Sequence, residues 1–301
     1  MQNGVNRVGG RFDFSVGTML DPLTRRLLRG AGTVPASSGR GPVVLMYHSI
    51  VPKRSADHDE WTISRATFER HLRLLSSEGW HTACVSDLRH PKALPQKTVA
   101  ITFDDGYADN YENGFALLQQ AAMRATWFVV TNEIGGRSVW VEYDAGVKPL
   151  LTPAQLKEME AAGMEIGGHT RSHPRLSRLD PLEMQREVLG GKRDLEGLLG
   201  KPVSSFAYPF GDFNAAAVNA VRKAGYEIAC TARPGWLGSD SNPLLIRRVS
   251  VFPTDGPGVL ARKLAFADNA VGWPRMLVYA RDRLAFRLRR GGGRRRGSQK
   301  T

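Results

Sequence analysis

The chain has 301 residues, of which 42% are hydrophobic and 24% are charged, so it can form one large α/β domain or two small ones. Its formal net charge is +13, and the two ends carry nearly all of it. Residues 1–42 hold six Arg and two Asp, and residues 281–301 hold eight Arg, one Lys and one Asp. Because residues 43–280 are nearly neutral, this pattern argues against an enzyme that acts on nucleic acid. The basic ends of the chain could still bind a membrane surface or a polyanion.

The two cysteines and the N-terminus restrict the cellular context. Cys84 and Cys230 lack the spacing of a zinc finger or redox motif, so we expect two buried free thiols. Residues 1–42 show no secretory pattern, and no stretch approaches the roughly 20 apolar residues of a membrane span. We therefore expect a flexible basic leader on a protein that is cytoplasmic or peripheral to the inner membrane. An unrecognised export signal in the leader stays open.

Apolar runs alternate along the chain with amphipathic segments that begin at capping residues. Predicted helices follow Ser64, Thr152, Asp180 and Asn214, and a further helix spans residues 115–122. Predicted strands cover residues 43–47, 98–103, 125–130, 164–166, 203–207, 226–231 and 246–251. Strands that alternate with capped helices indicate parallel βαβ units, here about seven of them, with functional residues at the carboxyl ends of the strands.

The pattern changes past Pro253. Residues 256–290 are predicted to be a helical extension in which five apolar residues share one face: Trp273, Leu277, Ala280, Leu284 and Leu288. Such a basic amphipathic helix either docks on the barrel, which we favour, or makes a peripheral contact with an anionic membrane. Residues 291–301 are expected to form a disordered Arg-rich tail.

Two motifs point to metal chemistry. Asp104 and Asp105 follow an apolar run and precede Gly106, and adjacent carboxylates are costly to ionise together unless a cation relieves their repulsion. His169 and His173 supply two imidazoles four positions apart. One carboxylate with two imidazoles is a plausible ligand set for a catalytic metal. The alternatives are an ordinary Asp-Gly turn and a histidine N-cap network.

Taken together, these motifs resemble those of the NodB-type polysaccharide deacetylases, carbohydrate esterase family four. Residues 102–106 are similar to the first family motif, residues 169–173 to the second, and residues 206–211 to a variant of the third. Residues 44–49 are similar to the subgroup that deacetylates poly-N-acetylglucosamine. The resemblance covers roughly residues 43–253, implies a domain over 43–255, and implies a distorted (β/α)7 barrel.

The resemblance also implies roles for the motif residues. Asp105, His169 and His173 would bind a divalent metal, and Asp104 would be the base that accepts a proton from the attacking water. Imidazole and carboxylate ligands favour zinc, with cobalt, nickel and iron left open.

His48 is the candidate acid. The commoner family arrangement places a proton-donating histidine near the end of the domain, but this chain has no histidine after His173. His48 ends the first predicted strand, which a closed barrel brings beside the last one, and the poly-N-acetylglucosamine subgroup carries its acid in this position. The alternative is a polar histidine that only caps a strand.

The third motif and nearby aromatic residues are assigned to substrate binding. By resemblance, the backbone N–H of Phe210 would bind the oxyanion, and Tyr208 with Pro209 would line the sugar site. Trp140 and Tyr143 are the candidate saccharide stackers.

An arginine contacts the base in many family members, but Phe206 and Ala207 occupy its place here. We expect Arg247 or Arg248 to replace it near the substrate, the alternative being plain surface charge. The family's Asp-x-x-Asp-Trp motif is also missing.

The sequence thus predicts a metal-dependent hydrolase that removes an N-acetyl group from an amino sugar and releases acetate. Two alternatives are a deformylase or deacylase of a lipid-linked sugar at the membrane and a hydrolase of a non-sugar C–N bond. A third, remote alternative is a non-catalytic saccharide-binding protein.

Overall fold

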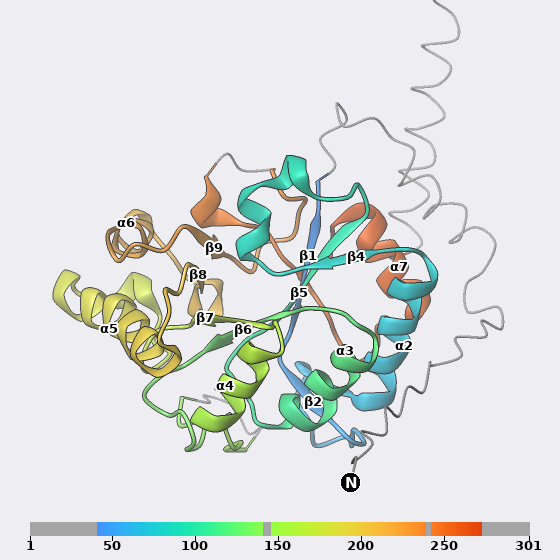
Figure 1. Cartoon of the computed structure of the whole chain (residues 1–301), viewed down its shortest axis with the longest axis horizontal. Helices are drawn as coiled ribbons and strands as arrows, with labels where there is room; N and C mark the ends of the chain where they lie inside the picture. The colour runs from blue at the N-terminus through green and yellow to red at the C-terminus, as the bar shows by residue number, and fades with distance from the viewer. Residues whose placement is uncertain (1–40, 141–145, 239–241, 273–301) are drawn as a thin grey trace, which may run out of the picture.

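The structure is a computed structural model that describes residues 41–140, 146–238 and 242–272 (Figure 1). Its main sheet contains eight parallel strands. They are β1 (Val43–Tyr47), β4 (His81–Ala83), β5 (Thr98–Phe103), β6 (Thr126–Val129), β7 (Glu165–Gly168), β8 (Ser205–Ala207), β9 (Ile228–Cys230) and β10 (Val249–Ser250).

Seven of these strands follow the order β10-β1-β5-β6-β7-β8-β9, and β4 pairs with the first half of β5. A parallel bridge between Cys230 and Ile246 connects β9 to the residues that lead into β10. The sheet therefore curls back on itself, with the helices arranged around it (Figure 1). The predicted distorted (β/α)7 barrel is confirmed.

The described helices are of two kinds: four begin directly after the predicted caps Ser64, Thr152, Asp180 and Asn214, and two have no side-chain cap. They are α2 (Arg65–Ser77), α3 (Ala116–Gln120), α4 (Pro153–Ala161), α5 (Pro181–Leu199), α6 (Ala215–Lys223) and α7 (Pro257–Phe266). The Ser64 side chain accepts a hydrogen bond from the Thr67 amide, and Thr152 and Asp180 each form a capping box. Helix α5 ends at Gly200, whose φ of 70° is the left-handed conformation that glycine adopts without strain.

Short elements complete the fold. A π-helical turn (Tyr111–Phe115) precedes α3, and 3₁₀ turns cover Ser86–Arg89, Pro91–Ala93, Leu176–Arg178, Pro209–Gly211 and Pro243–Leu245. Strands β2 (Ser49–Val51) and β3 (Thr62–Ser64) pair in a separate parallel sheet. The sequence analysis missed β2, β3 and β4, because three residues are too few to show an apolar period.

Helix α7 packs against α2, and its apolar residues belong to the same core as the strands. The beginning of the predicted extension is therefore packed with the barrel. The leader (1–40), the predicted amphipathic face (273–290) and the tail (291–301) lie outside the described residues. Within the described ranges, no helix is long and apolar enough to cross a membrane. Cys84 and Cys230 are buried free thiols, as predicted.

Alternation along the strands sorts the side chains into two sets. Residues that pack in the main core, which includes the apolar faces of the helices, are Val43, Leu45, Tyr47, Val99, Ile101, Phe103, Phe206, Tyr208, Val249 and Val251. A second cluster, made by the alternate positions, contains Val44, Ala100, Phe128, Ala207, Ile228, Cys230 and Ile246. The second set faces the barrel interior. Residues that continue its alternation past the ends of the strands should therefore point into the same space.

Candidate active site

A cavity of about 440 Å³ lies at the carboxyl ends of the strands. Its lining consists of Met46, His48, Asp59, Glu60, Trp61, Asp104, Asp105, Tyr107, Trp140, His169, His173, Arg175, Phe210, Gly211, Ala232 and Arg248. Met46, His48, Asp104 and Arg248 share the parity of the barrel interior with Val44, Ala100 and Ile246. The period of two therefore delivers residues from β1, β5 and the entry to β10 to one space.

Both carboxylates of the Asp pair face this cavity although they are adjacent in sequence. Asp104 continues the inward alternation of β5, and its amide still donates to the Tyr47 carbonyl of β1. At Asp105 the backbone turns to φ 72° and strand β5 has ended. This left-handed turn is what allows the second side chain to point to the same side as the first.

Asp105 and the two histidines converge on one point. The Asp105 Oδ1 lies 3.5 Å from His169 Nε2 and 3.3 Å from His173 Nε2. All three side chains are buried, and their ligand atoms lie within 4.8 Å of one another. Two imidazole nitrogens and a carboxylate oxygen at these separations suit a divalent cation with an open position.

Hydrogen bonding fixes His169 in the tautomer that a metal ligand needs. Its Nδ1 lies 2.8 Å from the Ala207 carbonyl oxygen, which can only accept, so Nδ1 carries the proton and Nε2 is left available to bind a cation. Burial lowers the pKa of His173 to about 3 and keeps its imidazole neutral. Burial alone would raise the pKa of Asp105, but contact with His169 and the nearby histidines holds it well below its usual value. The Nδ1 hydrogen bond of His169 and the ionised Asp105 carboxylate thus suit a cation.

Arg248 holds Asp104. Its Nη1 and Nη2 lie 2.6 and 2.7 Å from the two carboxylate oxygens, and its Nε donates to the Thr231 carbonyl. Burial favours the protonated acid, but the Arg248 charge outweighs it and holds the pKa of Asp104 below its usual value. Of the two predicted arginines, Arg248 is the one that contacts Asp104. It borders the cavity, but its side chain is fully buried in this ion pair and is not exposed to a substrate.

His48 also lines the cavity and is half-buried. Its ring centroid is 4.7 Å from that of Trp61, which in turn packs 5.4 Å from Phe252. Burial lowers the pKa of His48, whereas the carboxylates of Asp105 and Asp104 raise it. The imidazole lies in the same cavity as both carboxylates.

Aromatic residues form the rim beside the histidines. The rings of Phe210 and Trp140 lie 4.5 and 5.2 Å from that of His173. Phe210 has a φ of 58°, is 39% exposed, and carries the Arg175 guanidinium 4.2 Å above its ring. Both aromatic residues lie where the sequence placed them, at the cavity.

Three residues predicted to contact substrate do not line the cavity. Tyr208 is fully buried and its hydroxyl donates to the Leu244 carbonyl, because the alternation of β8 directs it, like Phe206, into the main core. Pro209 is also buried and does not line the cavity. Arg247, one residue out of the inward register, donates to the Pro234 carbonyl. Tyr143 lies outside the described residues.

The sequence analysis missed part of the lining. Asp59, Glu60 and Trp61 belong to the connection between β2 and β3, and Arg175 follows the second histidine motif. Arg175 could have been predicted to lie near the cavity, because it is two residues from His173 in the sequence. No motif in the β2–β3 connection indicated that its residues reach the cavity.

This fold and this site define a (β/α) barrel with a candidate metal centre at the carboxyl ends of its strands. The profile of a family described as polysaccharide deacetylase matches residues 92–229. The chain is also 32% identical over 214 residues to YxkH of Bacillus subtilis (strain 168), a protein assigned to the polysaccharide deacetylases, and the match covers 70% of this chain and 71% of the relative. The chain therefore belongs to the polysaccharide deacetylase family.

Other comparisons agree. A poly-beta-1,6-N-acetyl-D-glucosamine N-deacetylase of Staphylococcus aureus (strain MRSA252) is 22% identical over 209 residues, 65% of this chain and 70% of the relative. The deacetylase PplD of Streptococcus pyogenes, solved in complex with acetate, is similar with a TM-score of 0.66 at 23% identity, over 75% of this chain and 99% of that one. The structure of IcaB from Ammonifex degensii is similar with a TM-score of 0.64 at 24% identity, over 75% of this chain and 98% of that one. These two structures support the fold.

Proposed function

We propose that this protein hydrolyses the N-acetyl group of an amino sugar in a polysaccharide, with a divalent metal, and releases acetate. The observation that carries the proposal is the convergence of Asp105, His169 and His173 beside an Asp104 carboxylate that Arg248 keeps ionised. The substrate class is supported by the names of the relatives, among them a poly-beta-1,6-N-acetyl-D-glucosamine N-deacetylase.

Asp105, His169 and His173 fit a divalent cation, since their donors converge and His169 is held in the ligand tautomer. Such a cation would polarise the amide carbonyl and acidify the attacking water. We propose zinc, because two imidazoles and one carboxylate are typical zinc ligands at catalytic sites.

Asp104 would be the general base. Held by Arg248, it stays ionised at neutral pH and can accept one proton from the water as the water oxygen bonds to the carbonyl carbon. The backbone N–H of Phe210, at the cavity rim, would donate to the oxygen that becomes negative in this step.

His48 would be the general acid. As the C–N bond breaks, the imidazolium gives its proton to the sugar nitrogen, so that acetate and a free amine leave. Transfer of the Asp104 proton to His48 then restores both residues. The low pKa caused by burial makes the imidazolium a stronger acid towards a poor leaving group. Trp140, on the rim, would stack on the sugar ring.

The test is acetate release from N-acetylglucosamine oligomers by wild type and His48→Ala, with and without a chelator. The proposal predicts acetate that the chelator abolishes and that falls by roughly 10²–10⁴-fold in the variant. Activity that persists in the variant would remove His48 from the mechanism and leave the rest. Absence of acetate from the metal-loaded wild type would favour a lipid-linked sugar or a non-sugar amide as substrate.

A further inference from the structure

The orientation of His48 has no support from its second ring nitrogen. A catalytic or metal-binding histidine is commonly oriented by a hydrogen bond to the nitrogen that does not react. Here Nδ1 of His48 is buried and has no hydrogen-bond partner among the described residues. The ring must therefore be positioned through its backbone and through the surfaces that it touches.

The backbone of His48 is held by a side chain from the segment that follows the Asp pair. Along β1 and β5 the ladder ends where the Asp104 amide donates to the Tyr47 carbonyl, because β5 turns away at Asp105. The next carbonyl, that of His48, accepts from Asn110 Nδ2 at 2.8 Å. Asn110 is fully buried. The Asn110 side-chain amide thus takes the place of the next backbone hydrogen bond between β1 and β5, one position after β5 has ended.

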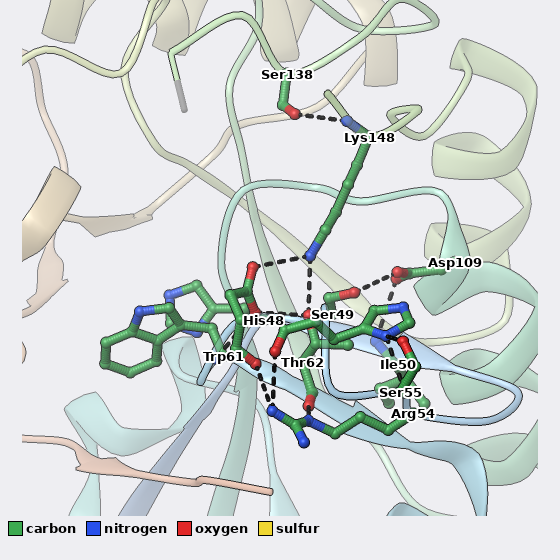
Figure 2. Close-up of polar contacts among 12 residues, drawn as sticks. His48, Ser49, Ile50, Arg54, Ser55, Trp61, Thr62, Asp109, Ser138 and Lys148 are labelled. Atoms are coloured by element: carbon green, nitrogen blue, oxygen red, sulfur yellow. Dashed lines mark hydrogen bonds and ion pairs between the residues drawn. The ribbon is translucent and has the colours of Figure 1, made fainter. Parts of the chain in front are cut away.

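Neighbouring contacts hold the rest of this turn. Asp109 accepts from the Ser49 hydroxyl at 2.5 Å and from the Ile50 amide at 3.2 Å, and Asn113 Nδ2 donates to the Ile50 carbonyl at 3.0 Å. Figure 2 shows Asp109 directed at Ser49 on one side of His48 and Trp61 on the other.

Trp61 is itself fixed. Its amide donates to Asp59 Oδ1 at 3.0 Å, and Asp59 pairs with Lys148 at 3.2 Å. The Lys148 ammonium also donates to the Thr62 hydroxyl (Figure 2). The imidazole is therefore held between an anchored backbone and an anchored indole face.

We propose that Asn110 is a positioning residue for the acid His48. This inference rests on the proposed function, in which His48 protonates the leaving nitrogen. Asn110 lies five residues after Asp105, so one short segment carries the base and also holds the backbone of the acid. The hydrogen bond between Asn110 and His48 then helps to set the separation of acid and base.

The test compares two substrates in Asn110→Leu, which is close in volume and lacks the donor, and in the smaller Asn110→Ala. N-acetylglucosamine oligomers need a protonated leaving group, whereas 4-nitrophenyl acetate releases a phenolate without one. We expect kcat on the amide to fall by roughly 10- to 100-fold, since misplacement by about 1 Å can cost that much, with KM within about twofold. We expect ester hydrolysis to change by less than about threefold, because it does not require the acid.

Asn113→Leu is the matched control. It also removes a buried amide that donates to a carbonyl of this turn, but the carbonyl belongs to Ile50. We expect its amide-to-ester ratio to stay within about twofold of wild type, because the His48 backbone keeps its anchor. Parallel loss of both activities in the Asn110 variants, or an equal ratio change in Asn113→Leu, would overturn the proposal.

His48→Ala separates this inference from the proposed function. If His48→Ala shows no amide-selective loss, the acid assignment itself fails. If it does and the Asn110 variants do not, only the positioning role fails. A crystal structure of Asn110→Leu gives a readout independent of activity: we expect the imidazole to shift relative to an unmoved Asp104, and an unmoved imidazole contradicts the proposal.

Discussion

Four residues at the site adopt left-handed backbone conformations that residues other than glycine rarely adopt. Asp105, Thr170, His173 and Phe210 have φ values between 58° and 72°. Such conformations cost of order 1–3 kcal/mol each and persist only where the surroundings enforce them. The Thr170 hydroxyl illustrates this, since it accepts from the His173 amide and donates to the His169 carbonyl. Backbone strain is thus concentrated at the candidate site.

Arg248→Met tests the buried ion pair. The substitution leaves the Asp104 carboxylate buried without its partner, so we expect the free energy of unfolding to fall by about 3–5 kcal/mol. Arg247→Met is the control, because it removes a half-buried hydrogen bond to Pro234 worth about 1 kcal/mol. Urea denaturation measures both, and equal losses would contradict the role given to Arg248.

Asp104→Asn tests the base. The amide keeps the shape of the carboxylate but cannot accept a proton, so we expect kcat for acetate release to fall by roughly 10²–10⁴-fold. The metal content of the purified protein should stay equal to wild type, because the proposed ligands are Asp105, His169 and His173. Loss of bound metal in this variant would assign Asp104 to the metal site.

Site residues could be predicted from the sequence where they belong to a recognisable motif. The Asp and His motifs identified four residues that the structure brings together, and chain order with the lack of later histidines identified His48, which shares their cavity. Tyr208 and the choice between Arg247 and Arg248 depended on register: shifting by one residue exchanges the inner and outer faces of a strand. The end of β8 and the beginning of β10 could not be placed that finely from an apolar run.

At the scale of elements, capping chemistry made helix boundaries predictable. The capping box at Asp180 and the terminal Gly200 gave α5 its observed limits. The three-residue strands β2 and β3 had no such signals, and their connection carries Asp59 and Trp61 to the cavity. The missed elements therefore account for much of the missed lining.

A buried polar network joins α2, α7 and β1. His71 Nε2 donates to the Asp255 carbonyl at 2.5 Å, so its Nδ1 accepts from the Tyr47 hydroxyl at 3.1 Å. Lys263 pairs with Asp255 at 2.5 Å and donates to the Ser250 carbonyl. Burial lowers the pKa of His71 to about 4, which keeps the imidazole neutral in the folded protein.

This network predicts a pH-dependent stability. An unfolded histidine has a pKa of about 6.5, so between about pH 6.5 and 4 the unfolded chain binds a proton that folded His71 refuses. Stability should therefore fall as the pH falls through this window. We expect His71→Gln to remove about 1.36 kcal/mol per pH unit of that slope.

The control for this prediction is His90→Gln, in which an exposed imidazole is replaced. Chemical denaturation at several pH values should leave its slope as in wild type. An unchanged slope in His71→Gln would contradict the buried neutral state of His71.

At the scale of the molecule, barrel closure assembles the site. Asp104 and Arg248 are 144 residues apart, and His48 and Arg248 both lie outside the residues 92–229 that the family profile matches. Strand β1 pairs with β5 on one side and with β10 on the other, so His48 and Arg248 lie close to Asp104 in the folded barrel. That the first and last strands are neighbours was predictable from barrel closure, whereas the ion pair of Arg248 with Asp104 depended on the register of the residues before β10.

A metal bound by residues that follow two different strands should stabilise the whole barrel. Asp105 follows β5, while His169 and His173 follow β7, and an ion bound only in the folded state raises stability by mass action. We expect a chelator to lower the melting temperature of the metal-loaded protein by several degrees, about 2.7 kcal/mol being lost if the free metal was at 100 times its Kd. Asp105→Ala should melt at the same temperature with and without chelator, and a chelator effect in that variant would argue against this triad.

The most direct measurement of the central claim is the simultaneous quantification of acetate and free amine produced from N-acetylglucosamine oligomers. Wild type and Asp105→Ala would be compared after incubation with the same zinc concentration. Hydrolysis at the triad predicts equal amounts of acetate and amine from wild type and almost none from the variant. Equal yields from both proteins, or acetate without amine, would contradict metal-dependent N-deacetylation at this site.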